Sequence, residues 1–97
     1  MPKRMRDLPE EYHVHRRSLT QAIGARVSAR RAALRLTQEQ LRARMELEQV
    51  AISRAQYSRI ENGEALPNAA ELKALRAILG VSYDWLIEGE DKHRREV

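Results

Sequence analysis

The chain has 97 residues, no cysteine and a formal net charge of +4 at pH 7. A chain of this length has room for one compact domain, and without cysteine it cannot form a disulfide framework or a thiolate metal site. No apolar run approaches the roughly 20 residues that span a bilayer, and the N-terminus lacks the apolar stretch of a signal peptide. We therefore expect a cytoplasmic protein that does not associate with membranes.

The positive charge is concentrated in the first two thirds of the chain. Residues 1–17 carry a net charge of +2, residues 18–63 one of +4 and residues 64–97 one of −2. This distribution is typical of a face that binds a polyanion such as a nucleic acid. An ordinary solvated surface would give the same distribution, so the motifs must decide between the two.

Residues 1–17 are expected to form either a basic N-terminal arm or a short extra helix. Pro9 followed by Glu10 and Glu11 suits the first turn of a helix, because proline tolerates the first helical position and acidic residues are favoured there. A flexible arm would explain the same composition.

Four helix-start signatures follow, each a small polar residue with Glu or Gln three residues later. They are Ser18 with Gln21, Thr37 with Gln40, Ser53 with Gln56, and Asn68 with Glu71. Gly63, Gly80 and Gly89 follow apolar stretches and suit helix ends. The signals predict helices at about 19–34, 38–48, 54–62, 69–79 and 83–88, and no strand pattern competes with them. We expect an all-α, five-helix domain over residues 18–90 and a charged tail over residues 91–97.

Helical periodicity assigns the core of this domain. The predicted core residues are Ile23, Val27, Leu34, Leu41, Met45, Tyr57, Ile60, Leu72, Leu75, Leu79 and Leu86.

Four stretches of the chain resemble the XRE-type helix-turn-helix family, which includes phage repressors and Cro-like proteins. They are Ile23-Gly24-Ala25-Arg26-Val27, Leu36-Thr37-Gln38-Glu39-Gln40-Leu41, Ser58-Arg59-Ile60-Glu61-Asn62-Gly63 and Leu79-Gly80-Val81-Ser82-Tyr83-Asp84-Trp85-Leu86. The resemblance covers residues 23–90 and implies a compact phage-repressor-like fold. It also implies that the helix at 54–62 is a recognition helix in the major groove of DNA, with the preceding helix crossing the phosphate backbone.

The predicted recognition helix has an outward face suited to reading bases. Helical spacing puts Tyr57, Ile60 and Glu61 on one face. The residues predicted to contact bases are Arg54, Ala55, Gln56, Ser58 and Arg59. Arginine can give two hydrogen bonds to guanine, glutamine can pair with adenine, and alanine can touch a thymine methyl group. The alternative is a plain solvated face, although the segment lacks the mixed lysine and glutamate typical of one.

Gln38 and Asn62 are the candidate phosphate-binding residues. Gln38 falls in the first turn of its helix, where unpaired backbone amides and the helix dipole favour an anion; simple capping is the alternative. The resemblance places Asn62 at the turn after the recognition helix, where family members touch a phosphate. It also pairs Glu61 with Arg31 as a structural ion pair, which would compensate a carboxylate on a buried face.

The resemblance is interrupted before the recognition helix. The family spacing between Leu41 and Ser53 is exceeded by five residues, the range 46–50, and Ala51 stands where a glycine is common. We expect the second helix to be longer by about one and a half turns, roughly 7 Å. The alternative is that only the turn is longer.

The resemblance implies a homodimer on a near-palindromic double-stranded DNA operator. Tyr83, Trp85 and Ile87 gather apolar surface near the end of the domain, so we predict that they form the dimer contact; packing of Trp85 in its own core is the alternative. The predicted function is sequence-specific DNA binding by a dimeric transcriptional repressor. An antitoxin or restriction controller with a protein partner would share the same DNA-binding face. A protein-bridging scaffold would bind DNA weakly and without sequence preference.

No enzyme activity, cofactor or metal site is predicted. No acid, base and nucleophile gather by helical spacing. His13 and His15 form an isolated pair, for which an exposed arm is the simpler interpretation than a metal site.

Overall fold

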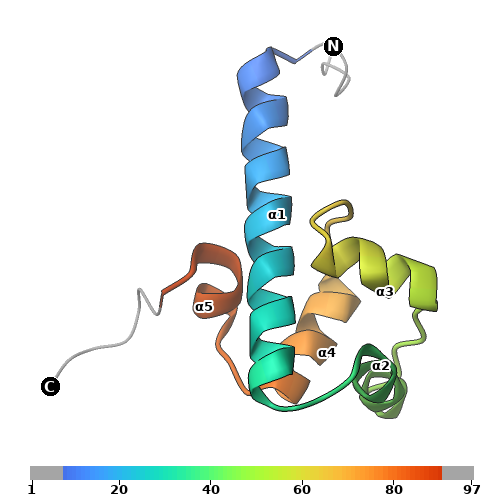
Figure 1. Ribbon diagram of the computed structural model, residues 1–97. Helices are drawn as coiled ribbons and strands as arrows, with labels where there is room; N and C mark the ends of the chain where they lie inside the picture. Colours follow the sequence, from blue (N-terminus) through green and yellow to red (C-terminus); the bar gives the residue numbers. More distant parts are fainter. Residues whose placement is uncertain (1–7, 91–97) are drawn as a thin grey trace, which may run out of the picture.

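The computed structural model describes residues 8–90, which form five helices and no strand (Figure 1). The helices are α1 (Glu10–Ala33), α2 (Gln38–Leu47), α3 (Arg54–Glu61), α4 (Ala69–Leu79) and α5 (Tyr83–Glu88). In Figure 1, α1 runs along the length of the molecule, with α3 and α4 on one side and α5 on the other. The expected all-α, five-helix fold is confirmed.

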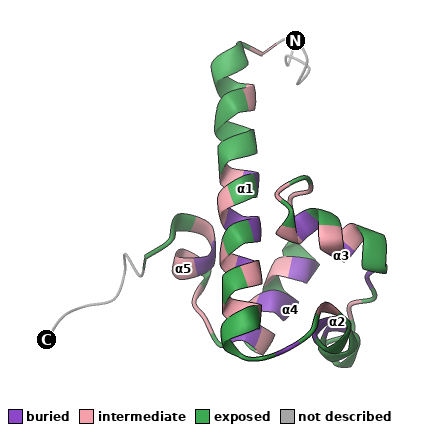
Figure 2. Cartoon of the chain, in the orientation of Figure 1, coloured by how far each residue is buried: buried purple, intermediate pink, exposed green. Residues whose placement is uncertain are grey.

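The first helix begins at Glu10 rather than near residue 19, so the helix start predicted at Ser18 is wrong. Pro9 is the N-cap position, and two acidic residues in the first turn suit the helix dipole. The short helix considered for residues 1–17 is therefore continuous with α1 from Glu10 onward. Figure 2 shows that the N-terminal half of α1 projects beyond the other helices and is mostly exposed. The remainder of that segment, residues 1–7, and the tail at 91–97 lie outside the described residues.

The core forms where α1, α2, α3, α4 and α5 meet, and nearly all of the predicted core residues are buried in it. Leu34 is an exception, because it lies just after the last turn of α1 and is exposed; Leu36, two residues later, is buried instead. Leu72 is only partly buried against the cluster. Ile52 and Ala74 join the core without having been predicted.

Gly24 allows α1 and α3 to pack with their backbones in close approach. A Cβ atom at this position would lie 2.2 Å from the carbonyl oxygen of Ile60. Gly63, which has a φ of +77°, lies against the same helix, where a Cβ atom would come 2.9 Å from the Cα of Gln21. The close approaches at Gly24 and Gly63 together hold the C-terminal part of α3, and the turn that follows it, against α1.

The five extra residues before α3 are divided between a helix and a turn. Residues 46 and 47 continue α2, Glu48 is its C-cap, and Gln49 adopts a left-handed backbone with a φ of +65°. α2 thus ends at Leu47, within one residue of the predicted end at 48, but only two of the five extra residues are helical, fewer than the expected one and a half turns. Gln49, rather than Ala51, is the residue that takes the left-handed conformation in this turn.

Burial explains why α2 stops there. The positions that would next fall on the buried face of α2, three and four residues after Met45, are Glu48 and Gln49, so a longer helix would bury polar rather than apolar side chains. Ile52 is buried in the core, which requires the chain to turn back before it. The reversal is closed by backbone hydrogen bonds from Gln49 to Glu46 and from Val50 to Met45.

Two arginines of α1 hold the ends of the last two helices. Arg26 donates from Nη1 to the carbonyl oxygens of Leu86 (3.1 Å) and Ile87 (3.0 Å), at the end of α5. Arg30 donates from Nε to the carbonyl oxygen of Leu79 at the end of α4, over 2.9 Å. The last carbonyl groups of a helix have no partner within it and carry partial negative charge, so cationic donors are favoured there.

Candidate nucleic-acid interface

α3 begins at Arg54, and one side of the helix packs against the core. Ser53 caps it, because the Ser53 Oγ accepts a hydrogen bond from the backbone N–H of Gln56 at 3.1 Å. Tyr57 and Ile60 are fully buried beneath the helix. The five predicted base-contacting residues lie away from these anchors: Arg54, Ala55 and Arg59 are exposed, and Gln56 and Ser58 are partly exposed. α3 therefore presents a polar, accessible side along its whole length (Figure 2).

The structure brings Arg31 and Glu61 together at the buried side of α3. Arg31 donates from Nε to Glu61 Oε2 at 2.6 Å and from Nη2 to Oε1 at 3.0 Å. The side chains are 17% and 4% exposed, respectively. Glu61 also accepts from the Tyr57 hydroxyl and from Gln38 Nε2, the latter at 3.1 Å. Side chains from α1, α2 and α3 thus meet on one carboxylate.

This cluster keeps the carboxylate ionised. Burial alone would raise the pKa of Glu61, but the hydrogen bonds from Arg31, Tyr57 and Gln38 outweigh burial and hold the pKa below its usual value. Burial and the hydrogen bond to Glu61 raise the pKa of Tyr57, so its hydroxyl stays a donor. The hydrogen bond to Glu61 likewise raises the pKa of Arg31.

Gln38 opens α2, and its side chain takes part in the Glu61 cluster. One of its two amide hydrogens is used in the bond to Glu61. Thr37 caps the helix by accepting from the backbone N–H of Gln40 at 3.0 Å, which leaves the N–H groups of Gln38 and Glu39 without a partner inside the helix. The sequence placed Gln38 in this first turn but did not indicate its contact with Glu61.

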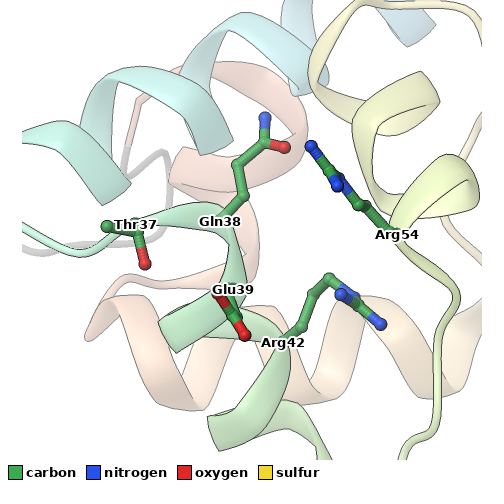
Figure 3. A pocket seen from close by; sticks show the side chains of 5 residues that line it. All are labelled: Thr37, Gln38, Glu39, Arg42 and Arg54. Atoms are coloured by element: carbon green, nitrogen blue, oxygen red, sulfur yellow. The ribbon is translucent and has the colours of Figure 1, made fainter.

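A cleft of about 360 Å³ lies between the start of α2 and the start of α3; we call it the α2–α3 cleft. Thr37, Gln38, Glu39, Arg42 and Arg54 line it (Figure 3). In Figure 3 the ends of the Gln38 and Arg54 side chains point toward each other across the cleft. Two guanidinium groups face one carboxylate here, so the lining is net positive.

Arg42 is a lining residue that the sequence reasoning missed. It follows Gln38 by four residues, so helical spacing would have put both on one face of α2. Its Nε donates to the carbonyl oxygen of Ile52 at 3.2 Å, which holds the side chain beside the turn before α3.

The other end of α3 is also accessible. Asn62 is the exposed C-cap residue, and Arg59 lies 3.9 Å from Glu64 through its Nε. The Arg59 and Glu64 side chains are 57% and 60% exposed, so this ion pair is weak. Arg59 is therefore available for other contacts.

The three predicted dimer residues lie on α5, on the other side of α1 from α3. Tyr83 is 44% exposed, and the guanidinium carbon of Arg76 lies 5.1 Å from its ring centre. Trp85 and Ile87 are partly buried, and Trp85 packs against the chain's own core. Tyr83 is thus the most accessible of the three.

No helix of residues 8–90 is long and apolar enough to cross a membrane. No group of three or more His, Asp or Glu side chains in that range is placed to hold a metal ion. His13 and His15 both lie on the projecting part of α1.

Comparison with known proteins identifies the family. A family model described as helix-turn-helix matches residues 27–86, from the middle of α1 to α5, which is more than half of the chain. No curated protein and no solved structure matches the chain. The matched segment contains α2, α3 and α4, the Arg31–Glu61 pair and the α2–α3 cleft. The chain belongs to the XRE-type helix-turn-helix family of DNA-binding regulators.

Proposed function

We propose that the chain binds double-stranded DNA in a sequence-specific manner, with α3 lying in the major groove. The observation that carries this proposal is the two-sided character of α3. Tyr57 and Ile60 anchor one side in the core, whereas Arg54 and Arg59 are exposed on the other. An α-helix with its side chains is about 10–12 Å in diameter, so α3 fits a major groove about 12 Å wide.

The accessible side chains of α3 supply the groups that distinguish base pairs. Arg54 and Arg59 can each give paired hydrogen bonds to O6 and N7 of guanine, and Gln56 can pair with N6 and N7 of adenine. Ser58 can bond to several bases, and Ala55 leaves room for a thymine methyl group. We assign direct base contact to these five residues.

Gln38 and Asn62 are assigned to phosphate groups on the two sides of α3. For Gln38, the free backbone N–H groups of the first turn of α2 are the donors that suit an anion, because its side chain already donates to Glu61. Asn62 is exposed at the end of α3, where its amide can donate outward. Contacts of this kind fix the position of a protein on DNA without reading sequence.

Selection of bound duplexes from a random DNA pool tests the proposal. The wild-type chain is expected to enrich one sequence, and Arg59→Ala is expected to lose preference at one base pair, which corresponds to about 1–3 kcal/mol, while keeping nonspecific affinity. Arg44→Ala, an exposed arginine of α2 outside the α2–α3 cleft, is the matched control and is expected to select the wild-type sequence. A wild-type pool with no enriched sequence would contradict the proposal and favour a protein-bridging scaffold.

We further propose that two copies pair through α5 and act as a repressor. The accessible Tyr83, together with Trp85 and Ile87, is the surface assigned to this contact. Half-sites of a dimer of this kind lie about 34 Å apart, one turn of DNA. When a selected sequence is placed across a promoter, addition of the protein is expected to lower transcription in a purified system. Increased transcription on addition of the protein would contradict the repressor role.

A further inference from the structure

A second groove lies at the opposite end of α3 from the α2–α3 cleft. It has a volume of about 290 Å³ and is formed by the N-terminal half of α1, by α3 and by the turn at residues 63–66. Arg16, Arg17 and Thr20 line it from α1, and Gln56 and Arg59 line it from α3. We call it the α1–α3 groove. Two of the residues assigned to base contact therefore also form its wall.

The early start of α1 creates this groove. Had the helix begun near residue 19, Arg16 and Arg17 would precede it; instead they lie on a continuous helix from Glu10. Gly63 allows the turn after α3 to lie close to α1, because a Cβ atom at this position would come 2.9 Å from the Cα of Gln21. The two arginines are thereby held beside the end of α3.

The charge of the groove is net positive. Arg16, Arg17 and Arg59 contribute three guanidinium groups, and Glu64 contributes one carboxylate. Arg17 donates to Glu10 at 3.0 Å and Arg59 lies 3.9 Å from Glu64, but all four of these side chains are exposed. Exposed ion pairs contribute little free energy, so a phosphate group can replace either carboxylate as the partner.

We propose that the α1–α3 groove binds phosphate groups of the DNA backbone through Arg16 and Arg17. This inference rests on the proposed function, because it assumes that α3 lies in the major groove. The major groove is bordered on both sides by sugar-phosphate backbone, so basic side chains that flank a helix lying in it face phosphate groups. The α2–α3 cleft lies at the Arg54 end and the α1–α3 groove at the Arg59 end. Arginine suits this ligand, since its planar guanidinium bonds phosphate oxygens in pairs.

The double variant Arg16→Gln/Arg17→Gln tests the proposal. Fluorescence anisotropy would measure its affinity for the selected duplex and for a shuffled duplex over a range of salt concentrations. Both affinities are expected to fall by a similar factor, because phosphate contacts carry no sequence information. The slope of log K against log salt is expected to be shallower by about 0.9 for each phosphate that the variant no longer neutralises. The double variant Arg16→Lys/Arg17→Lys keeps the charges and is expected to retain most of the wild-type slope.

Arg44→Gln/Lys73→Gln is the matched control. It removes the same charge from exposed positions that line neither the α2–α3 cleft nor the α1–α3 groove, so its salt slope is expected to equal that of the wild type. Equal slopes for wild type and Arg16→Gln/Arg17→Gln, or an equal decrease in slope for both charge-removing variants, would overturn the inference while leaving wild-type sequence selection intact. Absence of selection by the wild-type chain would instead refute the proposed function. Circular dichroism of each variant is expected to show an unchanged total helix content, to which α1 contributes 24 residues.

Discussion

Arg31 and Glu61 connect α1 to the C-terminal end of α3 through two hydrogen bonds between one guanidinium and one carboxylate. The same guanidinium donates from Nη1 to the carbonyl oxygen of Leu36 at 2.7 Å, in the segment that leads into α2. Arg31 therefore fixes α3 and the start of α2 relative to the same point on α1. Together with the packing of α2 against α3, this shared attachment holds the two helices in the arrangement on which the proposed binding in the major groove depends.

Glu61→Ala is expected to lower the free energy of unfolding by roughly 3–5 kcal/mol, because it leaves the partly buried guanidinium of Arg31 without its carboxylate partner. For a domain of this size the melting temperature should fall by more than about 10 °C. Glu64→Ala removes an exposed glutamate with a long, weak ion pair and is expected to change stability by less than about 0.5 kcal/mol. An equal effect of the two substitutions would contradict a structural role for the pair.

Acid is expected to destabilise the domain through the same carboxylate. The pKa of Glu61 is lower in the folded protein than its ordinary value of 4.5, so its ionised form stabilises the fold above that pH. The contribution is lost as the pH falls below 4.5 and through the lower folded-state pKa. Urea unfolding of the wild type and of Glu61→Gln between about pH 2 and pH 6 measures how the free energy of unfolding depends on pH. The variant should show a flatter dependence, and parallel curves would argue against the assignment.

Four of the five helices were predicted from the sequence to within one residue at each end, because each has a capping residue that the structure uses. Each of the four, Thr37, Ser53, Asn68 and Ser82, accepts a hydrogen bond from the backbone N–H of the third residue of its helix. Ser18 has the same local pattern but lies inside α1. A serine followed by glutamine marks a start only where the preceding residues are not helical, and here they are. The α1–α3 groove was missed for this reason.

Gly24→Ala is expected to destabilise the fold, although alanine is the better helix former by about 1 kcal/mol. The added Cβ would lie 2.2 Å from the carbonyl oxygen of Ile60, so α3 must move away from α1. Overpacking of this kind costs about 1–3 kcal/mol, which chemical denaturation would measure. A more stable Gly24→Ala variant would show that α1 and α3 can separate without cost. Local sequence does not reveal this role, because it does not show which backbone faces Gly24.

Gly80→Ala provides the comparison for that variant. Its Cβ would have open space, with the nearest atom 4.0 Å away, but the backbone has a φ of +66°. We expect Gly80→Ala to lower the free energy of unfolding by about 1 kcal/mol because of the left-handed conformation alone.

Gln49→Gly is expected to raise the free energy of unfolding by up to about 1 kcal/mol. Gln49 has a φ of +65°. This left-handed conformation costs a residue with a Cβ atom about 1–2 kcal/mol, a cost that glycine avoids. The greater flexibility of glycine in the unfolded chain offsets part of the gain. Glu46→Gly, three residues earlier in α2, should instead lower stability by about 1 kcal/mol. Stability changes of opposite sign for the two variants in thermal unfolding would verify where α2 ends. A loss of stability in both variants would indicate that the helix continues through Gln49.

Tyr83→Ser is expected to weaken self-association if α5 forms the dimer contact. Tyr83 is 44% exposed, so the substitution removes accessible apolar surface with little change to the core. Tyr12→Ser is the matched control, since Tyr12 is 54% exposed on the projecting part of α1. Sedimentation equilibrium over a range of concentrations would measure both. A monomeric Tyr12→Ser variant beside a dimeric Tyr83→Ser variant would move the interface to α1.

The arginine contacts from α1 to the ends of α4 and α5 have a consequence for synthesis on the ribosome. The bonds from Arg26 to Leu86 and Ile87 span 60 and 61 residues, and the bond from Arg30 to Leu79 spans 49. α1 therefore binds carbonyl groups that are synthesised 49 to 61 residues after its arginines, and closing so long a loop carries an entropic cost. A nascent chain that has emerged only as far as α3 already contains the side chains that we assign to base contact, but α1 lacks the helix ends that its arginines hold. The domain completes its fold only when α5 has left the exit tunnel.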